Sequence, residues 1–423
     1  MKRPADLLAQ PGWWRYDPAL VTICAALVSL GLVMVYSASV AVAIDAHQGE
    51  TYYFVRQLVF FGIGVVALVG LSRLPYQRLM ITGKPLYALS LALLVVVLLL
   101  GHHAGGAKRW IQVSSLAQVQ PSELMKVSLL LLLSGMYARD VRRARTFTRG
   151  LLHCVLIIGL PIALIVAEPD LGTSIIVATT GFAVFFAAGA SLVQLPLLVG
   201  SAVGLVTLLI KVSPYRFSRF TTFMDPLAVQ NAQGVSYQVQ QALIALGSGG
   251  IFGRGLGASR QKFSYVPAPH TDSIYAIVGE ELGYVGCVAV ILLFIALAWR
   301  GLAIAREAPD QFGALVATGI TCSLVVQAFI NIAAVSSSIP FTGVPLPFIS
   351  YGGSSLIVSL AGVGILLNIG SQAVPNAVAT AERPVSRKLV HRPVGQRGAA
   401  PAPRSRPANG AATASHVRRL RHE

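Results

Sequence analysis

Charged side chains are scarce in this chain. They make up 12% of its 423 residues, whereas a typical soluble domain carries about 25%. Hydrophobic residues make up 55% of the sequence, and the mean hydropathy is +0.69. A soluble domain of this size cannot shield so much apolar surface from water. The composition therefore excludes an ordinary soluble fold.

Cysteine is also rare, with four residues in the whole chain. All four lie inside apolar runs, and no pair has the spacing of metal ligands. We interpret them as small residues of the core rather than as a metal site or a disulfide framework. They are Cys24, Cys154, Cys287 and Cys322.

Long apolar runs account for the composition. A run of about 20 residues spans the hydrocarbon core, where only helices and closed barrels satisfy every backbone polar group. The runs are continuous rather than alternating, which favours helices. The first run also lacks a cleavage site and is too long for a signal peptide, so it should remain as an anchor. We predict an all-α integral membrane protein with about ten transmembrane helices, over residues 19–43, 53–72, 85–101, 121–138, 150–166, 171–188, 192–211, 271–299, 312–335 and 350–370.

Basic residues are concentrated in alternate loops. Clusters of Lys and Arg lie in the N-terminal arm (1–18), at 73–84, at 139–149 and at 300–306. Because Lys and Arg of short loops stay on the cytoplasmic side, these segments should all face the cytoplasm. An even number of spans then places both termini in the cytoplasm.

The segment 371–423 contains ten Lys and Arg and two acidic residues, about half of the net charge of +17. It is rich in Pro, Ala and Arg without apolar periodicity, which predicts a disordered cytoplasmic tail. Attraction to anionic lipid and docking to a partner are both open as its role. Nucleic-acid binding is not expected, because no folded reader module accompanies the charge.

A long outer segment, 212–271, separates the seventh and eighth predicted spans. It is rich in glycine, too polar to span, and contains Arg216, Arg219 and Lys262. Long loops of this kind are usually functional. Its positive charge suits an anionic ligand at the outer face of the membrane, and a solvated loop near the lipid headgroups is the alternative.

Polar residues inside spans are costly and need a reason. Glu123 and Lys126 are three residues apart and share a helix face. They form either a local ion pair or part of a polar cavity in which Lys126 meets a phosphate. Arg109, just outside the same span, adds a cation at that membrane level, although Lys108-Arg109-Trp110 is also an ordinary interfacial anchor.

The densest polar cluster opens the eighth span. His270-Thr271-Asp272 follows a proline-rich stretch. Either Thr271 or Asp272 caps the helix that follows, or Asp272 is a carboxylate at the mouth of a membrane cavity and acts as a general base. Glu280 and Glu281 lie about 12–14 Å deeper along the same helix. Bulk water does not reach them there, so we expect them to pair with Lys126 or another buried cation.

Two turns complete the candidate site. In the turn Glu168–Thr173, Asp170 or Thr173 is expected either as a helix cap or as a polar group of the site. Between 345 and 355, two glycines give the backbone freedom that suits a re-entrant segment. The polar and glycine residues of that segment are Ser350, Tyr351, Gly352 and Gly353.

Together these segments resemble the SEDS family (shape, elongation, division and sporulation). The resemblance covers about residues 19–370. The matching motifs, in order, are QPSELMK at 120–126, EPDLGTS at 168–174, PYRFSRFTTFMDP at 214–226, SYQVQQALIALGSGGIFGRGLG at 236–257, HTDSIYAIVGEELG at 270–283 and PFTGVPLPFISYGGSS at 340–355.

The resemblance implies a ten-span fold and a peptidoglycan glycosyltransferase that polymerises lipid II at the outer face of the bacterial cytoplasmic membrane. It also implies a class B penicillin-binding protein as the partner transpeptidase, and other division-complex membrane proteins. Asp272 matches the essential carboxylate of the family, and Glu123 and Lys126 match polar positions that matter for activity. Chain length and the basic tail favour an FtsW-like division role at the septum over a RodA-like elongation role.

Some residues depart from the family pattern. An acidic residue is missing from the stretch 265–269, Ser273 replaces a common Phe, and Glu168 stands where Gln is frequent. None of these changes removes the expected base, but they bear on substrate fit.

Glycosyl transfer from lipid II expels a pyrophosphate, so cations at the outer face would stabilise the leaving group. The expected contacts are Arg216, Arg219, Lys262 and Lys126, with Arg109, Glu123 and His270 as further substrate-binding residues. A divalent cation, Mg²⁺ or Mn²⁺, could bridge carboxylate and pyrophosphate, but no dedicated ligand set is evident. A lipid II flippase and a non-catalytic division scaffold are the alternative functions.

Overall fold

The computed structural model describes residues 16–104, 107–112, 118–140, 142–191, 193–225, 235–263 and 265–372. Most of the predicted N-terminal arm, and the predicted tail from residue 373 onward, lie outside the described residues.

Each of the ten predicted spans corresponds to one helix. They are α1 (Pro18–Asp45), α2 (Tyr52–Arg73), α3 (Leu79–Leu100), α4 (Pro121–Arg139), α5 (His153–Ala167), α6 (Leu171–Ala187), α7 (Gln194–Val212), α10 (Ile274–Glu307), α11 (Gln311–Val335) and α12 (Gly353–Ser371). Short helical turns precede some of them: η3 (Tyr76–Arg78), η4 (Arg143–Arg145) and the π-helix η5 (Phe147–Leu152). Within the described residues, eight helices have the length and hydropathy to cross a membrane, and α6 is a shorter apolar helix.

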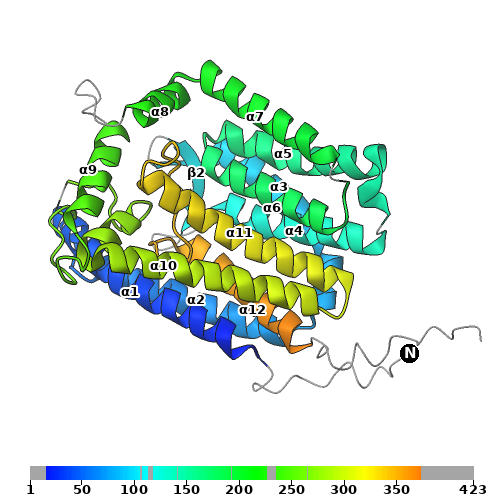
Figure 1. Cartoon of the computed structure of the whole chain (residues 1–423), viewed down its shortest axis with the longest axis horizontal. Coiled ribbons are helices and arrows are strands. Elements are labelled where there is room, and N and C mark those ends of the chain that lie inside the picture. Colours follow the sequence, from blue (N-terminus) through cyan, green and yellow to red (C-terminus); the bar gives the residue numbers. More distant parts are fainter. Residues whose placement is uncertain are drawn as a thin grey trace, which may run out of the picture.

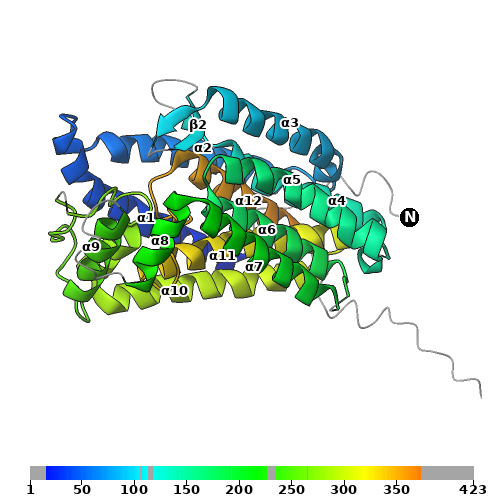
Figure 2. The same ribbon diagram turned by 90° about the horizontal axis from the view of Figure 1, so that it is seen from above.

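Of the ten helices, α4 is the one in neither of these groups. It carries Glu123 and Lys126 near its start and is buried along most of its length. The helices run side by side along the long axis of the molecule (Figures 1 and 2). The all-helical membrane fold predicted from the apolar runs is therefore confirmed.

One small β-sheet lies between α3 and α4. Its strands β1 (His102–Ala104), β2 (Ala107–Gln112) and β3 (Gln118–Val119) are antiparallel in the order β1-β2-β3. Ile111 pairs with Val119, and the Ser354 hydroxyl donates to the Gln118 carbonyl, which ties the sheet to α12. These strands were not predicted, because they are too short for an alternating pattern to stand out in the sequence.

The outer segment 212–271 is more ordered than the loop we expected. It contains α8 (Pro214–Met224) and α9 (Val235–Ser248), which lie at one end of the bundle in both views (Figures 1 and 2). Thr222 on α8 and Ser236 on α9 are joined by a hydrogen bond of 2.7 Å between their hydroxyls. Neither helix is long enough to span, in agreement with the sequence.

Helix α10 is interrupted at Gly283, whose φ of 68° and ψ of −166° are not helical. The turn that follows α9 fills the break. Arg254 and Gly255 donate their backbone N–H groups to the carbonyls of Glu280 and Glu281, each at 3.0 Å. Beyond the break, the N–H groups of Tyr284 and Val285 donate back to residues 250 and 251. Non-helical backbone within a membrane protein requires this kind of internal pairing.

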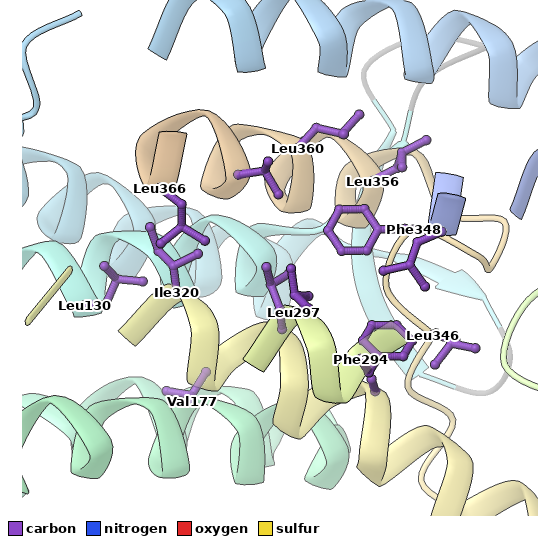
Figure 3. Close-up of a cluster of buried hydrophobic side chains, with 14 of the residues drawn as sticks. Leu130, Val177, Phe294, Leu297, Ile320, Leu346, Phe348, Leu356, Leu360 and Leu366 are labelled. Carbon is purple, nitrogen blue, oxygen red and sulfur yellow. The ribbon is translucent and has the colours of Figure 1, made fainter. Parts of the chain in front are cut away.

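The core lies where α4, α6, α10, α11 and α12 meet, and the segment before α12 contributes to it (Figure 3). The side chains labelled there are Leu130, Val177, Phe294, Leu297, Ile320, Leu346, Phe348, Leu356, Leu360 and Leu366.

The outer surface of the bundle is apolar as well. Val66 is 73% exposed, Ile81 75% and Leu100 80%. Exposed apolar side chains in such numbers along the helices mark a surface that faces lipid rather than water. The protein is therefore a multi-span membrane protein.

Candidate active site

Asp272 lies just before Ser273, the N-cap of α10, and its side chain is partly exposed. The Gln238 amide of α9 donates to the Ser273 hydroxyl at 3.0 Å, so Asp272 lies at the end of the bundle where α9 lies. Its Oδ1 accepts a hydrogen bond of 3.0 Å from the Thr271 hydroxyl. The N-cap of α10 is Ser273, and no side chain caps the helix. The capping interpretation of Thr271 and Asp272 is therefore wrong, and the carboxylate is not used to hold the helix end.

Opposing influences act on the Asp272 carboxyl. Burial raises its pKa, because the charged form loses hydration, whereas the Thr271 hydroxyl, Arg219 and Gln238 lower it. The net result is a pKa above the ordinary value. A carboxylate with a raised pKa is a stronger proton acceptor, which suits a general base.

The backbone around Asp272 is fixed by α11. The Asn331 side-chain amide donates to the Asp272 carbonyl at 2.8 Å and to the Val344 carbonyl at 2.7 Å. Arg219 of α8 donates to the Phe341 carbonyl at 2.9 Å. Asp272, Arg219 and the segment 341–344 are therefore brought together from three distant parts of the sequence.

The turn before α6 packs against the same segment. A Cβ added at Gly172 would lie 2.3 Å from Val344 and 3.1 Å from Thr342, so only glycine allows this approach. A Cβ at the neighbouring Gly343 would lie 3.5 Å from Oδ2 of Asp272. The 341–344 segment thus lies between the α6 turn and the Asp272 carboxylate.

Asp170 caps α6, as one of our two interpretations expected. It accepts from the Thr173 N–H at 3.0 Å and from the Thr173 hydroxyl at 2.9 Å. Arg109 of β2 donates to the carbonyls of Glu168 and Pro169, and its Nε lies 3.9 Å from Asp170. Arg109 therefore organises this turn at the end of the bundle where Asp272 lies.

Glu168 is 1% exposed, and neither carboxyl oxygen has a hydrogen-bond partner among the described residues. Burial raises its pKa to about 8, and the nearby Asp170 adds to the effect while Arg109 opposes it. Its carboxyl group is therefore mostly protonated at neutral pH. Glu168 is also a position where the chain departs from the family pattern, in which Gln is frequent.

His270 lies in a cluster of aromatic rings. Its ring centroid is 4.7 Å from that of Tyr53 and 5.3 Å from that of Tyr351, and burial lowers its pKa to about 4. The Tyr351 N–H donates to the His270 carbonyl at 2.8 Å. His270 is thus neutral and links the residues before α10 to those before α12.

The segment 336–352 is a non-helical stretch between α11 and α12, buried at 341, 344 and 346–350, which fits the predicted re-entrant element. The Ser350 hydroxyl accepts from the Leu346 N–H at 2.8 Å, and the Gln57 amide donates to the Ser350 carbonyl at 3.2 Å.

Our reason for its two glycines needs correction. Gly352 has φ 176°, an extended conformation that any residue adopts. Gly353 is required by packing instead, because a Cβ there would lie 2.7 Å from the Phe60 ring.

Glu123 and Lys126 form the local ion pair of one interpretation, with Nζ 2.9 Å from Oε2 of Glu123. The same ammonium donates to Gln327 of α11 at 2.6 Å, and Gln327 in turn donates to the Pro345 carbonyl at 3.0 Å. Gln327 and Asn331 are one helical turn apart on α11, and both hold the segment 344–345. The pair therefore braces this segment from inside the bundle, and it does not pair with Glu280 or Glu281.

Glu280 and Glu281 find other cations. Glu281 pairs with Lys262, whose Nζ lies 3.2 Å from Oε1, and Glu280 pairs with Arg254 at 3.5 Å. Lys262 is only 4% exposed, and it also donates to the Gly257 carbonyl at 2.7 Å and to Ser37 of α1 at 3.2 Å. The expected pyrophosphate contact at Lys262 is thus replaced by a buried structural ion pair, because the lysine turns inward to neutralise Glu281.

Two other expectations about the site stay open. The side chain of Arg216 lies outside the described residues. Among the described residues, no group of three His, Cys, Asp or Glu side chains could hold a metal ion. A divalent cation beside Asp272 would therefore draw its other ligands from substrate phosphates and water, which is how Mg²⁺ is often held. It stays a prediction.

Four amide side chains near the site were not predicted from the sequence: Gln57, Gln238, Gln327 and Asn331. Gln327 and Asn331 carry a signal that could have revealed them, because they are four residues apart on one face of an otherwise apolar span. Gln238 and Gln57 carry no such signal, since their roles depend on which distant loops they meet.

Residues 18–374 match the model of a family described as cell cycle protein, which groups FtsW, RodA and SpoVE. The chain belongs to this family. The SEDS resemblance of the sequence motifs is therefore confirmed.

Among relatives, stage V sporulation protein E of Bacillus subtilis (strain 168) is 40% identical over 358 residues, covering 84% of this chain and 96% of the relative. A probable peptidoglycan glycosyltransferase FtsW of Trichlorobacter lovleyi is 38% identical over 361 residues, covering 84% and 93%. A probable peptidoglycan glycosyltransferase FtsW of Alkalilimnicola ehrlichii is 39% identical over 366 residues, which cover 85% of this chain and 90% of the relative.

Solved structures agree with this family assignment. A chain from work on the structural coordination of polymerization and crosslinking by a peptidoglycan synthase complex has a TM-score of 0.71 and 29% identity, covering 85% of this chain and 98% of that one. The rod shape determining protein RodA of Thermus thermophilus has a TM-score of 0.64 and 31% identity, covering 86% and 100%.

Proposed function

We propose that this SEDS protein is a peptidoglycan glycosyltransferase that polymerises lipid II into glycan strands during cell division. The observation that carries the proposal is the Asp272 carboxylate. It is partly exposed at one end of a membrane-spanning bundle, its pKa is raised, and it has no capping role. The names of the relatives, most of them probable peptidoglycan glycosyltransferases FtsW, support the same activity.

The chemistry begins with a hydroxyl of the acceptor sugar, which is a weak nucleophile. Asp272 accepts its proton as the oxygen attacks the anomeric carbon of the donor. The Thr271 hydroxyl and the Asn331 amide orient this carboxylate through its side chain and its backbone, respectively. The bond to the pyrophosphate breaks in the same step, and the leaving group takes the electron pair.

Negative charge then develops on the pyrophosphate, and cations close by lower the energy of the transition state. Arg219 is close enough to Asp272 for its positive charge to lower the pKa of the Asp272 carboxyl. Arg109 contributes from the α6 turn, where its guanidinium lies against Asp170. Lys126 and Lys262 are held by Glu123 and Glu281, so we assign them to the framework of the site rather than to the substrate.

The same proposal sets the orientation and the partners. The end of the bundle with Asp272, α8 and α9 faces the periplasmic side of the cytoplasmic membrane, and both termini face the cytoplasm, as the basic loops predict. The partner is a class B penicillin-binding protein, within a complex that contains other division proteins at the septum. The peptidoglycan synthase complex among the similar structures supports a partner of this kind.

A polymerisation assay tests the proposal. The purified protein and its transpeptidase are placed in nanodiscs with fluorescent lipid II and a β-lactam that blocks crosslinking. We expect a ladder of uncrosslinked glycan strands on a gel, dependent on this protein.

Two outcomes would contradict the proposal. Translocation of labelled lipid II in liposomes, abolished by Lys126→Ala in a protein that makes no polymer, would favour a flippase. If the purified complex made no polymer while partner binding was intact and cells synthesised their wall normally, that result would favour a scaffold.

A further inference from the structure

A second polar site lies at the opposite end of the bundle from Asp272. It is a pocket of about 320 Å³ between α3, α4 and α5. On α4, Glu123 and Arg139 are sixteen residues apart, which places the Arg139 end of the pocket about 24 Å from Glu123 along the helix axis. Nothing in the proposed reaction uses it.

The rim of the pocket is basic. Lys84 comes from the first turns of α3, Arg139 from the end of α4, Arg143 from η4 and His153 from the start of α5. Asp140 is its one acidic lining residue. Three Lys and Arg side chains against one Asp give the opening a net positive charge, so an anion is the ligand that it favours.

The inner wall of the pocket is apolar. It consists of Met80, Leu132, Met136 and Ile157, with Gly135 between the last two turns of α4. An inorganic anion gains nothing from contact with apolar side chains, whereas an acyl chain is stabilised by them. A ligand that fits both parts has a charged head and an apolar tail.

The surroundings place this opening at a membrane surface. Ile81 is 75% exposed and Leu156 62%, and these apolar side chains belong to α3 and α5, which both line the pocket. Phe147 of η5, just before α5, is 64% exposed. The apolar wall therefore continues toward the lipid-facing surface of the protein. A lipid could enter sideways from the bilayer and leave its headgroup at the basic rim.

The backbone around the rim is folded tightly. Gly150 of the π-helix η5 packs against the preceding turn, since a Cβ there would lie 2.3 Å from the Arg143 carbonyl. Tyr137 of α4 donates its hydroxyl to the Gly150 carbonyl at 3.3 Å. The loop that supplies Arg143 is therefore anchored to α4 rather than free to leave the pocket.

We propose that this pocket binds one anionic phospholipid of the inner leaflet, with its phosphate at Lys84 and Arg139 and an acyl chain against Met136 and Ile157. Basic pockets between helices at the cytoplasmic level of a membrane protein suit anionic headgroups. The bound lipid fills the gap between α3, α4 and α5 and braces the end of the bundle opposite the candidate active site.

The test is native mass spectrometry of the full-length protein, titrated with phosphatidylglycerol or phosphatidylcholine in the same detergent. We expect one phosphatidylglycerol to be retained, with phosphatidylcholine bound at least tenfold more weakly. Lys84→Gln combined with Arg139→Gln should lower the apparent affinity for phosphatidylglycerol by about tenfold or more. Thermal unfolding measured alongside should show stabilisation by phosphatidylglycerol in the wild type and little in this variant.

Arg73→Gln combined with Arg78→Gln is the matched control, because both residues are exposed basic side chains that precede α3 and do not line the pocket. It should change the affinity less than twofold. Equal loss in the control would show a general charge effect and overturn the proposal. Displacement of the lipid by millimolar inorganic phosphate would overturn it too, since the site would then bind a free anion.

Discussion

Asp272 illustrates how single residues acquire their chemistry from neighbours that are distant in sequence. Its carboxyl is desolvated by the folded chain, and Arg219, Gln238 and Thr271 partly offset the cost of its charge. The Asn331 amide fixes its backbone. The Lys262–Glu281 pair shows the reverse case, in which a buried lysine and a buried glutamate satisfy each other and no substrate. The first arrangement leaves a reactive group available, and the second strengthens the fold.

The raised pKa of Asp272 predicts the pH dependence of polymerisation. The base must be ionised, so the rate falls as the pH decreases through the pKa, and the acid limb lies above the value of about 3.9 that is usual for Asp. Thr271→Val removes a hydrogen bond that lowers the pKa. It should therefore shift the acid limb to higher pH, as initial rates across a pH series would show. An acid limb that moved to lower pH, or did not move, would contradict this role of Thr271.

The position of Asp272 could be singled out from the sequence, whereas the partner of Lys262 could not, for a physical reason. A carboxylate next to prolines at the start of an apolar span stands out without knowledge of the fold. The partner of a buried charge depends on which segments pack together, and Lys262 reaches Glu281 only because the turn after α9 inserts into the break of α10. Charge and position along the chain do not contain that information.

Helix α10 shows the same limit at the scale of elements. Its sequence reads as one long apolar helix from about 271 onward, and the span was predicted correctly. The break at Gly283 depends on hydrogen bonds from residues 250–255, which no local pattern reveals. The short strands β1 to β3 were missed for a related reason, since they are stabilised by pairing with one another and by Ser354 of α12.

Gly283→Ala tests the break. A Cβ at this position would lie 2.3 Å from the Gly253 nitrogen, and its positive φ is strained for alanine. We expect a loss of stability of about 2 kcal/mol or more, seen as a lower temperature of thermal unfolding in detergent. Gly62→Ala on α2 is the control, because no atom lies within 4 Å of its Cβ, and it should unfold at the same or a higher temperature. Equal unfolding temperatures for Gly283→Ala and the wild type would argue against the break.

At the scale of the whole molecule, ten helices with a lipid-facing apolar surface separate two ends of different chemistry. One end presents Asp272, Arg219 and the α6 turn, which come from three separate segments of the sequence. The other presents the basic pocket between α3, α4 and α5. The number of spans and the position of the basic loops could be predicted from the sequence, because hydropathy and charge are read directly from each segment. The assembly of the site required the fold.

The most direct test of the account compares the lipid II polymerisation rate of the wild type with that of Asp272→Asn, each in nanodiscs with its transpeptidase. Asparagine keeps the shape of the side chain and removes the proton acceptor, so unfolding temperature and partner binding should be unchanged. The account predicts a rate lower by about 100-fold or more, the usual contribution of a general base. A rate within about threefold of the wild type, from a folded and partner-bound Asp272→Asn protein, would contradict the assignment of Asp272 as the base.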